Sequence, residues 1–260
     1  RLRSRFAFSV GVSPIAPERE DSRTLMVQRP AWRSHVLALG LYALTGLLFA
    51  WPLPLRLFTR LPGRITGDTG VYVWNLWVFR HELLDGGHLP FATSQIFSAD
   101  RPADLSLHNY TVFADLLALP VLPLVGPVAA YNLVWILLTV IGACAMYLLV
   151  LDILHDGQAA VTRPADGRAA WIAAWLAGLL FAFSPALVAR STEHLSLLIG
   201  APLAAFTATW LRALRTGEKR WGAASGLMMA WAMASDPYYG VYCVVIAAFF
   251  LVAERVDISW

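Results

Sequence analysis

Residues 128–151, VAAYNLVWILLTVIGACAMYLLVL, decide the fold class of this chain because they contain no charged side chain. A transmembrane helix needs about 20 mostly apolar residues, and this stretch reaches that length. The whole chain has the same character, with 58% hydrophobic and 14% charged residues, against roughly 45–50% and 25% in soluble domains. The sequence therefore predicts an all-α fold, a polytopic transmembrane helical bundle.

The composition excludes several other classes of protein. Eleven Trp and thirteen Phe residues are too many for a disordered chain. The two cysteines, Cys144 and Cys243, both lie in apolar runs, which excludes a disulfide framework and a cysteine-based metal site. His81, His88 and His108 lack the spacing of a zinc motif, and the chain contains no P-loop, GxGxxG or GxSxG sequence. No metal site or certain cofactor is predicted.

Further apolar stretches lie on both sides of the central one. Together with it they predict about six spans, the others being residues 36–55, 169–189, 195–211, 221–235 and 237–253. Residues 112–125 are too short to cross and contain Asp115, Pro120 and Pro123. We interpret them as a re-entrant or interfacial segment.

The distribution of charge predicts the orientation in the membrane. Residues 1–33 carry a net charge of +4, from seven Arg and three acidic residues, so the remainder of this +3 chain sums to −1. This basic leader, residues 1–34, and the cluster from Arg212 to Arg220 are placed in the cytoplasm by the positive-inside rule. The transmembrane domain, residues 35–260, then presents an outer loop of residues 56–127. A basic excess confined to a leader does not indicate nucleic-acid binding.

The two ends of the sequence suggest further expectations. The chain starts at Arg1, and its first methionine is Met26, so residues 1–25 are interpreted as a disordered or non-native extension. Residues 254–260 carry no terminal feature, which favours a front portion of a longer protein.

The outer loop opens with Gly67-Asp68-Thr69-Gly70 and continues into an amphipathic helix. Asp68, Tyr72, Asn75 and Glu82 share one stripe of this helix, and an apolar face containing Trp74 and Trp77 lies opposite. Such a helix is expected to lie in the membrane interface with its apolar face down. Asp68 itself has two interpretations, as a helix N-cap or as a general base at the membrane–water boundary.

Two other polar positions interrupt the apolar stretches. Arg190 and His194 are one helical turn apart and can bind a phosphate, although a solvated turn with an Arg190–Glu193 ion pair explains them equally. Asp236, in the sequence Asp236-Pro237-Tyr238-Tyr239, is acidic at membrane depth, which indicates a functional position. The alternative is an Asp-Pro turn at the membrane edge.

The order of these features resembles the membrane region of GT-C-type glycosyltransferases. The resemblance rests on GDTGVYVWNLWVF and HELLDGGHLPF in the first outer loop, and then on NYTVFADLLALPVLPLVGPVAAYNLVW, FAFSPALVARSTEHLSLL and SDPYYGVY. It covers roughly residues 35–253 and is similar in layout to the bacterial protein mannosyltransferase and aminoarabinose transferase families.

This resemblance implies sugar transfer from a polyprenyl-phosphate donor to an acceptor at the outer face of a bacterial inner membrane. Asp68 corresponds to the acidic residue of the first outer loop and would be the general base. Arg190, Arg101 and His194 would balance the phosphate charge, while Asp236 and Tyr239 complete the candidate site. Because Thr69 follows Asp68 where the mannosyltransferases have a second acid, Glu82 or Asp104 would substitute for it.

Two other functions stay open at this point. A transporter or flippase of a lipid-linked substrate would need polar groups along its spans, which are nearly free of charge. A non-catalytic membrane subunit with the same fold is favoured by the short length. Membrane lipid and a lipid-linked sugar are the expected partners of this chain.

Overall fold

The structure, a computed structural model, describes residues 31–63, 67–96, 101–106, 108, 110–157 and 167–255. These residues are almost entirely helical, apart from connecting segments and one short antiparallel pair, β1 (Ala92–Thr93) with β2 (Ala103–Asp104). The predicted all-α class is therefore confirmed. The basic leader predicted for residues 1–34, including Met26, lies outside the described residues except for residues 31–34.

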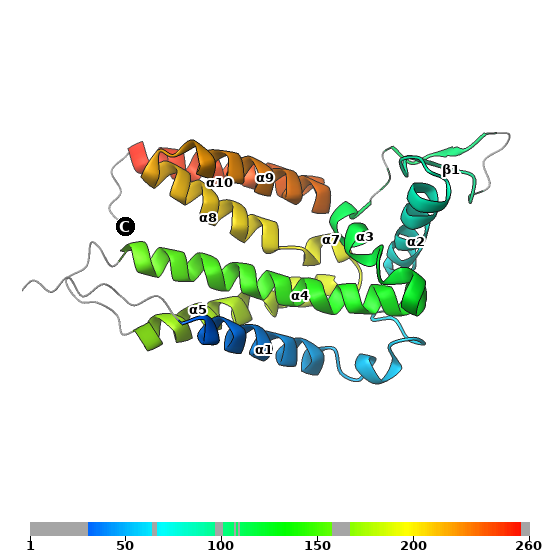
Figure 1. Ribbon diagram of the computed structural model, residues 1–260, viewed down its shortest axis with the longest axis horizontal. Coiled ribbons are helices and arrows are strands. Elements are labelled where there is room, and N and C mark those ends of the chain that lie inside the picture. Colours follow the sequence, from blue (N-terminus) through cyan, green and yellow to red (C-terminus); the bar gives the residue numbers. More distant parts are fainter. Residues whose placement is uncertain are drawn as a thin grey trace, which may run out of the picture.

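The longer helices lie side by side along the longest axis of the molecule (Figure 1). They are α1 (Trp32–Phe49), α4 (Leu122–Gly157), α5 (Gly167–Ala182), α8 (Ala201–Thr216), α9 (Lys219–Ser235) and α10 (Pro237–Arg255). α4 is central because it packs against α1, α5 and α8, while α9 and α10 pack onto α8 and onto each other.

Shorter elements gather at one end of these helices (Figure 1). We use the name cap for α2 (Thr69–Arg80), the π-helical turn η2 (His81–Asp85), the strand pair and α3 (Val112–Ala118). Three connecting elements are the 3-10 turn η1 (Leu53–Arg56), α6 (Pro185–Ser191) and α7 (Leu195–Leu198). The described residues of the predicted outer loop therefore lie at or near the cap end.

A glycine allows α1, α4 and α5 to pack closely. A Cβ atom on Gly178 would lie 2.2 Å from the Tyr42 hydroxyl and 2.5 Å from the Ala143 carbonyl oxygen. The Tyr42 hydroxyl donates a hydrogen bond to the Trp175 carbonyl at 2.8 Å. Any side chain at position 178 would therefore separate the three helices.

Helix length and hydropathy support the predicted spans only in part. Within the described residues, α4 is long and apolar enough to cross a membrane over Leu122–His155, and α5 with α6, bent by 42°, forms a second span if the pair counts as one. The prediction of about six spans counted apolar residues on both sides of a helix break as one span. Residues 195–211, for example, divide into α7 and α8, and α8 has only 16 residues.

Large apolar side chains nevertheless cover the outside of the helices. Leu180 of α5 is 71% exposed, Leu48 of α1 is 63% exposed and Val252 of α10 is 61% exposed. Others on α1 and α10 are Val36, Leu37, Leu44, Val241, Val244, Val245 and Phe249. Soluble monomers rarely expose continuous apolar areas of this extent, so these surfaces are suited to contact lipid or another protein.

The amphipathic helix α2 is buried on the side that was expected to face water. Its polar stripe faces inward, since Tyr72, Asn75 and Glu82 are all buried, whereas Val71 and Trp77 are exposed. The physical reason is that α3 and α4 pack on α2 and that the loop before α3 supplies a polar partner, since His108 Nε2 lies 2.7 Å from Asn75 Oδ1. On the apolar face of α2, Val71 and Trp77 are exposed and Trp74 is half-buried, so these side chains stay available for a membrane interface.

Residues 112–125 do not form a continuous helix. α3 ends at Ala118, α4 begins at Leu122, and Gly126 has a left-handed φ of 77° that kinks the start of α4. These breaks keep α3 in the cap, in contact with α2 and α9.

Candidate active site

Asp68 occupies the N-cap position of α2 but does not cap it with its side chain. The first turn is closed by the backbone instead, since the Tyr72 amide donates to the Asp68 carbonyl at 3.1 Å. The Asp68 side chain is 58% exposed. One of the two interpretations of Asp68 was a helix N-cap. Its carboxylate makes no capping hydrogen bond to α2 and is therefore available for other contacts.

The carboxylate of Asp68 contacts His194 instead. His194 Nδ1 lies 3.4 Å from Asp68 Oδ2, and the His194 side chain is 33% exposed. His194 stands at the N-cap of α7, and its amide donates to the Arg190 carbonyl at 2.8 Å. Because α6 ends and α7 begins here, the imidazole projects from a tight turn towards the start of α2.

Backbone contacts hold these two segments together. The Thr69 hydroxyl lies 2.8 Å from the Thr192 carbonyl oxygen and 3.3 Å from that of Pro62. Gly63 has φ +90°, and a Cβ atom there would lie 2.4 Å from the Thr192 carbonyl oxygen. The loop before α2 thus rests directly on the α6–α7 turn, and only glycine permits this approach.

Two buried side chains of α4 bind the chain that leads to α2 and the end of α6. The Trp135 indole donates to the Ser191 carbonyl at 2.6 Å. The Asn132 amide donates to the carbonyls of Leu57 and Arg60, each at 2.7 Å. Positions 132 and 135 are three residues apart and so share one helix face. The most apolar helix of the molecule therefore fixes the relative position of Asp68 and His194.

A pocket of about 370 Å³ lies against the segments that carry this pair. Pro62 and Thr192, whose carbonyl oxygens contact the Thr69 hydroxyl, belong to its wall, whereas Asp68 and His194 are not among its lining residues. Arg56 and Arg60 contribute two cations, and Trp51 and Trp135 contribute aromatic surface. The arrangement combines positive charge with an apolar wall, which suits an anionic amphiphile.

Sequence reasoning missed Arg56 and Arg60. The available signal was their position, because two arginines four residues apart follow the first apolar stretch on the side that the positive-inside rule leaves poor in cations. Arg190, which the sequence favoured, is exposed in the last turn of α6 and does not line the pocket.

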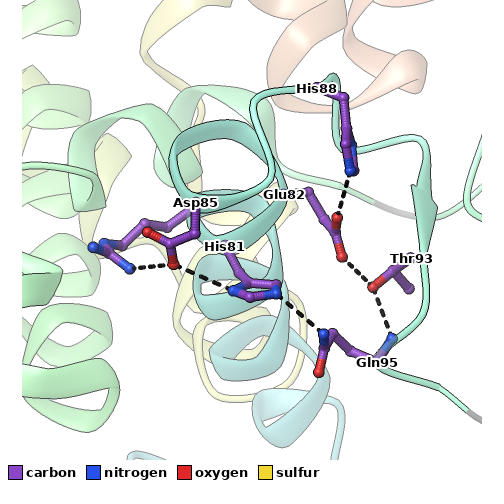
Figure 2. A network of polar contacts seen from close by, with 7 residues as sticks. His81, Glu82, Asp85, His88, Thr93 and Gln95 are labelled. Atoms are coloured by element: carbon purple, nitrogen blue, oxygen red, sulfur yellow. Dashed lines mark hydrogen bonds and ion pairs between the residues drawn. The ribbon is translucent and has the colours of Figure 1, made fainter.

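Glu82 lies too far along the cap to act with Asp68. The two residues are separated by the length of α2, about 21 Å at 1.5 Å per residue. Figure 2 shows Glu82 between His88, 3.2 Å from its Oε2, and the Thr93 hydroxyl, which donates to its Oε1. Glu82 is 5% exposed, and its contacts hold η2 against β1.

A second part of the same network is more exposed. His81 Nδ1 and Arg80 lie 3.2 Å and 3.1 Å from Asp85 Oδ2, and Gln95 Nε2 lies 3.1 Å from His81 Nε2 (Figure 2). These contacts close the turn that follows α2.

Asp104 and Arg101 also belong to the cap. Asp104 lies on β2, and its Oδ1 accepts hydrogen bonds from the Ser106 hydroxyl at 2.5 Å and the Ser106 amide at 2.8 Å. These bonds hold the pKa of Asp104 below its usual value and build a tight turn. Arg101 is exposed next to this strand. Both belong to the strand pair or the loop before β2, whereas Asp68 lies at the start of α2.

Asp236 and Tyr239 connect helices. The Asp236 carboxylate accepts a hydrogen bond from the Tyr238 amide at 2.9 Å. This contact favours the Asp-Pro turn, one of the two interpretations of this residue. The Tyr239 hydroxyl donates to the Leu197 carbonyl at 2.5 Å. Since Leu197 lies one turn after His194 on α7, Tyr239 supports the site from α10 without lining the pocket.

Asp115 is a buried carboxyl group to which the sequence analysis assigned no role. It is 0% exposed, and neither carboxylate oxygen has a hydrogen-bond partner among the described residues. Burial raises the pKa of Asp115 well above its ordinary value, and the Thr111 backbone offsets only part of this effect. Burial, together with Asp115 and Glu82, also raises the pKa of Tyr110 to about 12. An Asp within the apolar run 112–125 was the signal that could have found it.

Possible metal ligands do not gather in the part of the chain that the structure describes. No group of three or more His, Cys, Asp or Glu side chains there is arranged to hold an ion. Comparisons with protein-family models, curated proteins and solved structures found no match.

Proposed function

We propose that this chain is an integral membrane glycosyltransferase that moves a sugar from a polyprenyl-phosphate donor to an acceptor hydroxyl at the cap end of its helices. The observation that carries the proposal is the Asp68–His194 contact beside a pocket containing Arg56 and Arg60. A base and a pair of cations at the end of an apolar bundle are the groups that such a transfer requires.

The membrane placement involves about six segments, formed by α1, α4, α5 with α6, α8 with α7, α9 and α10. The exposed apolar side chains of α1, α5 and α10 support this placement. A helix of 16 residues such as α8 is about 24 Å long, shorter than a bilayer core of about 30 Å. Local thinning and tilting accommodate such a mismatch at modest cost.

Charge at the helix ends supports one orientation. Arg33, Arg168, Arg212, Arg215, Lys219 and Arg220 lie at the end opposite the cap. We call these residues the cationic end. Together with the leader, it belongs in the cytoplasm of a bacterial inner membrane by the positive-inside rule, so the cap and Asp68 face outward.

The chemical step follows from the positions of the polar groups. The Asp68 carboxylate removes the proton from the acceptor hydroxyl while the acceptor oxygen forms a bond to the sugar C1. The bond between C1 and the phosphate oxygen breaks, and its electron pair leaves with the polyprenyl phosphate, so the anomeric configuration inverts. Arg56 and Arg60 balance the charge that develops on the phosphate, and His194 orients the base.

The apolar wall of the pocket suits the lipid part of the donor. Trp51 is 61% exposed and lies beside a surface that also exposes Leu48, so the prenyl chain can reach the phosphate site from the bilayer. The acceptor arrives from the aqueous side, where the Asp68 carboxylate is accessible.

The test uses the full chain in lipid nanodiscs with a panel of polyprenyl-phosphate hexose, pentose and aminopentose donors. We expect at least one donor to release polyprenyl phosphate, and Asp68→Asn to stop the release. Binding of undecaprenyl phosphate alone, followed by native mass spectrometry, is the second measurement. Donor binding without release by the wild type would indicate a transporter or a non-catalytic subunit, and absence of both would overturn the proposal.

A further inference from the structure

A second, larger cavity lies away from the candidate active site. It is a groove of about 720 Å³ between α4 and α8, with parts of α1 and α9 at its edges. Most of its lining is apolar, including Leu137, Val140, Leu148 and Ala208. The proposal below rests on the membrane placement and is independent of the chemistry assigned to Asp68.

The groove is long enough for the acyl chain of a lipid. Its lining follows α4 from Leu137 to His155, a distance of about 27 Å at 1.5 Å per residue. One leaflet occupies about half of a bilayer core of about 30 Å, so the groove is long enough to hold a whole acyl chain of one leaflet. A groove of this shape fits one extended hydrocarbon chain better than a compact soluble molecule.

The polar lining is concentrated at one end. His35, Asp152, His155 and Arg212 all contribute side chains there. Arg212 Nε donates to both Asp152 carboxylate oxygens, at 3.0 and 2.9 Å, and its guanidinium lies over the Trp221 ring at 4.6 Å. His35 Nδ1 lies 3.0 Å from the Tyr147 hydroxyl. These contacts fix the end of the groove as a polar mouth.

Charge around this mouth is positive. Arg215 follows Arg212 by one turn on α8, and Arg33 precedes His35 on α1, and both are exposed. The cationic end contributes six Arg and Lys side chains, whereas Asp152 and Glu218 are the acids among the described side chains there. An anionic headgroup is therefore favoured over a zwitterionic one, by about 1 kcal/mol per basic residue near a membrane surface.

We propose that this groove binds one acyl chain of an anionic phospholipid from the cytoplasmic leaflet, with the headgroup phosphate at the cationic end. The site is distinct from the pocket of Arg56 and Arg60, because the two cavities share no lining residue and their cations lie at opposite ends of α1, which is about 27 Å long for its 18 residues. A bound chain would fill the space between α4 and α8 and so hold these two helices together.

The experiment measures lipid retention by the full chain with native mass spectrometry from detergent. Phosphatidylglycerol or phosphatidylcholine is added at equal concentration. We expect one phosphatidylglycerol per chain, retained about tenfold better than phosphatidylcholine, and loss of this retention in Ala208→Phe, which fills the groove. Leu180→Phe, on an exposed face of α5 outside the groove, is the matched control and keeps the lipid.

Separate variants test the charge. Arg33→Gln with Arg215→Gln is expected to reduce the preference for phosphatidylglycerol to about twofold, whereas Arg56→Gln with Arg60→Gln leaves it unchanged. If Ala208→Phe fails to fold, Ala145→Phe fills the same groove from α4. Equal retention of both lipids, retention in the filled variants, displacement by undecaprenyl phosphate, or a lipid-free dimer would each overturn the proposal.

Discussion

The Nδ1 atom of His194 lies 3.4 Å from the Oδ2 atom of Asp68, although a long stretch of sequence separates the two residues. Both side chains remain partly exposed, while the backbones that carry them are fixed by Thr69, Gly63 and the buried Trp135. Solvent-accessible polar groups on a rigid support are typical of sites that act on a ligand.

Asp68→Asn is expected to lower kcat for sugar transfer by about 10²–10⁴-fold, the usual contribution of a general base. Donor binding should change little, because the amide keeps the shape of the carboxylate. Release of polyprenyl phosphate in single-turnover assays provides the measurement. Asp85→Asn makes the same chemical change in η2, beyond the other end of α2, and a similar loss in that control would show that the effect is not specific to position 68.

His194→Ala is expected to lower kcat by about fivefold without changing the donor KM. The contact is exposed, so its free energy is about 1 kcal/mol or less, and the melting temperature should stay within a degree or two of wild type. Kinetics at saturating acceptor measure the effect, with Glu193→Ala as the neighbouring control. A change confined to KM would mean that His194 binds substrate and does not orient Asp68.

Arg56→Gln and Arg60→Gln are each expected to raise the donor KM by about tenfold or more, since a hydrogen bond to a charged group is worth about 1.5–3 kcal/mol. The double variant should lose binding of undecaprenyl phosphate altogether. Arg101→Gln in the cap is the control and should bind normally. If Arg101→Gln alone weakened binding, the phosphate site would lie in the cap.

Gly63→Ala is expected to destabilise the contact between the loop before α2 and the α6–α7 turn. The new Cβ would meet the Thr192 carbonyl and would also occupy a left-handed φ, which alone costs about 1–2 kcal/mol. Gly217→Ala has a comparable φ but open space around its Cβ. A larger loss of activity and of melting temperature at position 63 is the expected result, and equal effects would argue against the close approach.

Asp115→Asn is expected to change how stability depends on pH. The folded-state pKa of Asp115 is raised by burial, so the native protein binds a proton that the unfolded chain releases above its ordinary pKa of 3.8. The wild type therefore loses stability as pH rises from about 4 towards the folded pKa. The variant should melt higher than wild type at pH 8 and converge with it near pH 4. Parallel curves would show that Asp115 does not titrate in this way.

Local sequence patterns predicted the helices well. The apolar run around residues 128–151 lies within α4, the Gly86-Gly87 pair follows the end of η2, and Asp236-Pro237 separates α9 from α10. These features depend on residues near one another in the chain, so composition and spacing contain the information. Span counting was less successful, since apolar runs do not reveal breaks such as the one between α7 and α8.

The direction in which side chains point could not be obtained in the same way. Periodicity identified the polar stripe of α2, but burial by α3 and α4 turned that stripe inward. Glu82, which the resemblance offered as a partner of Asp68, lies beyond the far end of α2, and Asp104, the other residue offered, lies on β2.

The sequence by itself determined that the chain is apolar and helical, that its basic residues cluster in the leader and between Arg212 and Arg220, and that acidic residues occur in a few turns. Only the tertiary structure decided that Asp68 meets His194, that Arg56 and Arg60 share a pocket beside them, and that Asp115 is buried without a hydrogen-bond partner among the described residues. The physical reason is that hydrophobic burial is non-directional, whereas each of these placements depends on close packing between segments far apart in the chain.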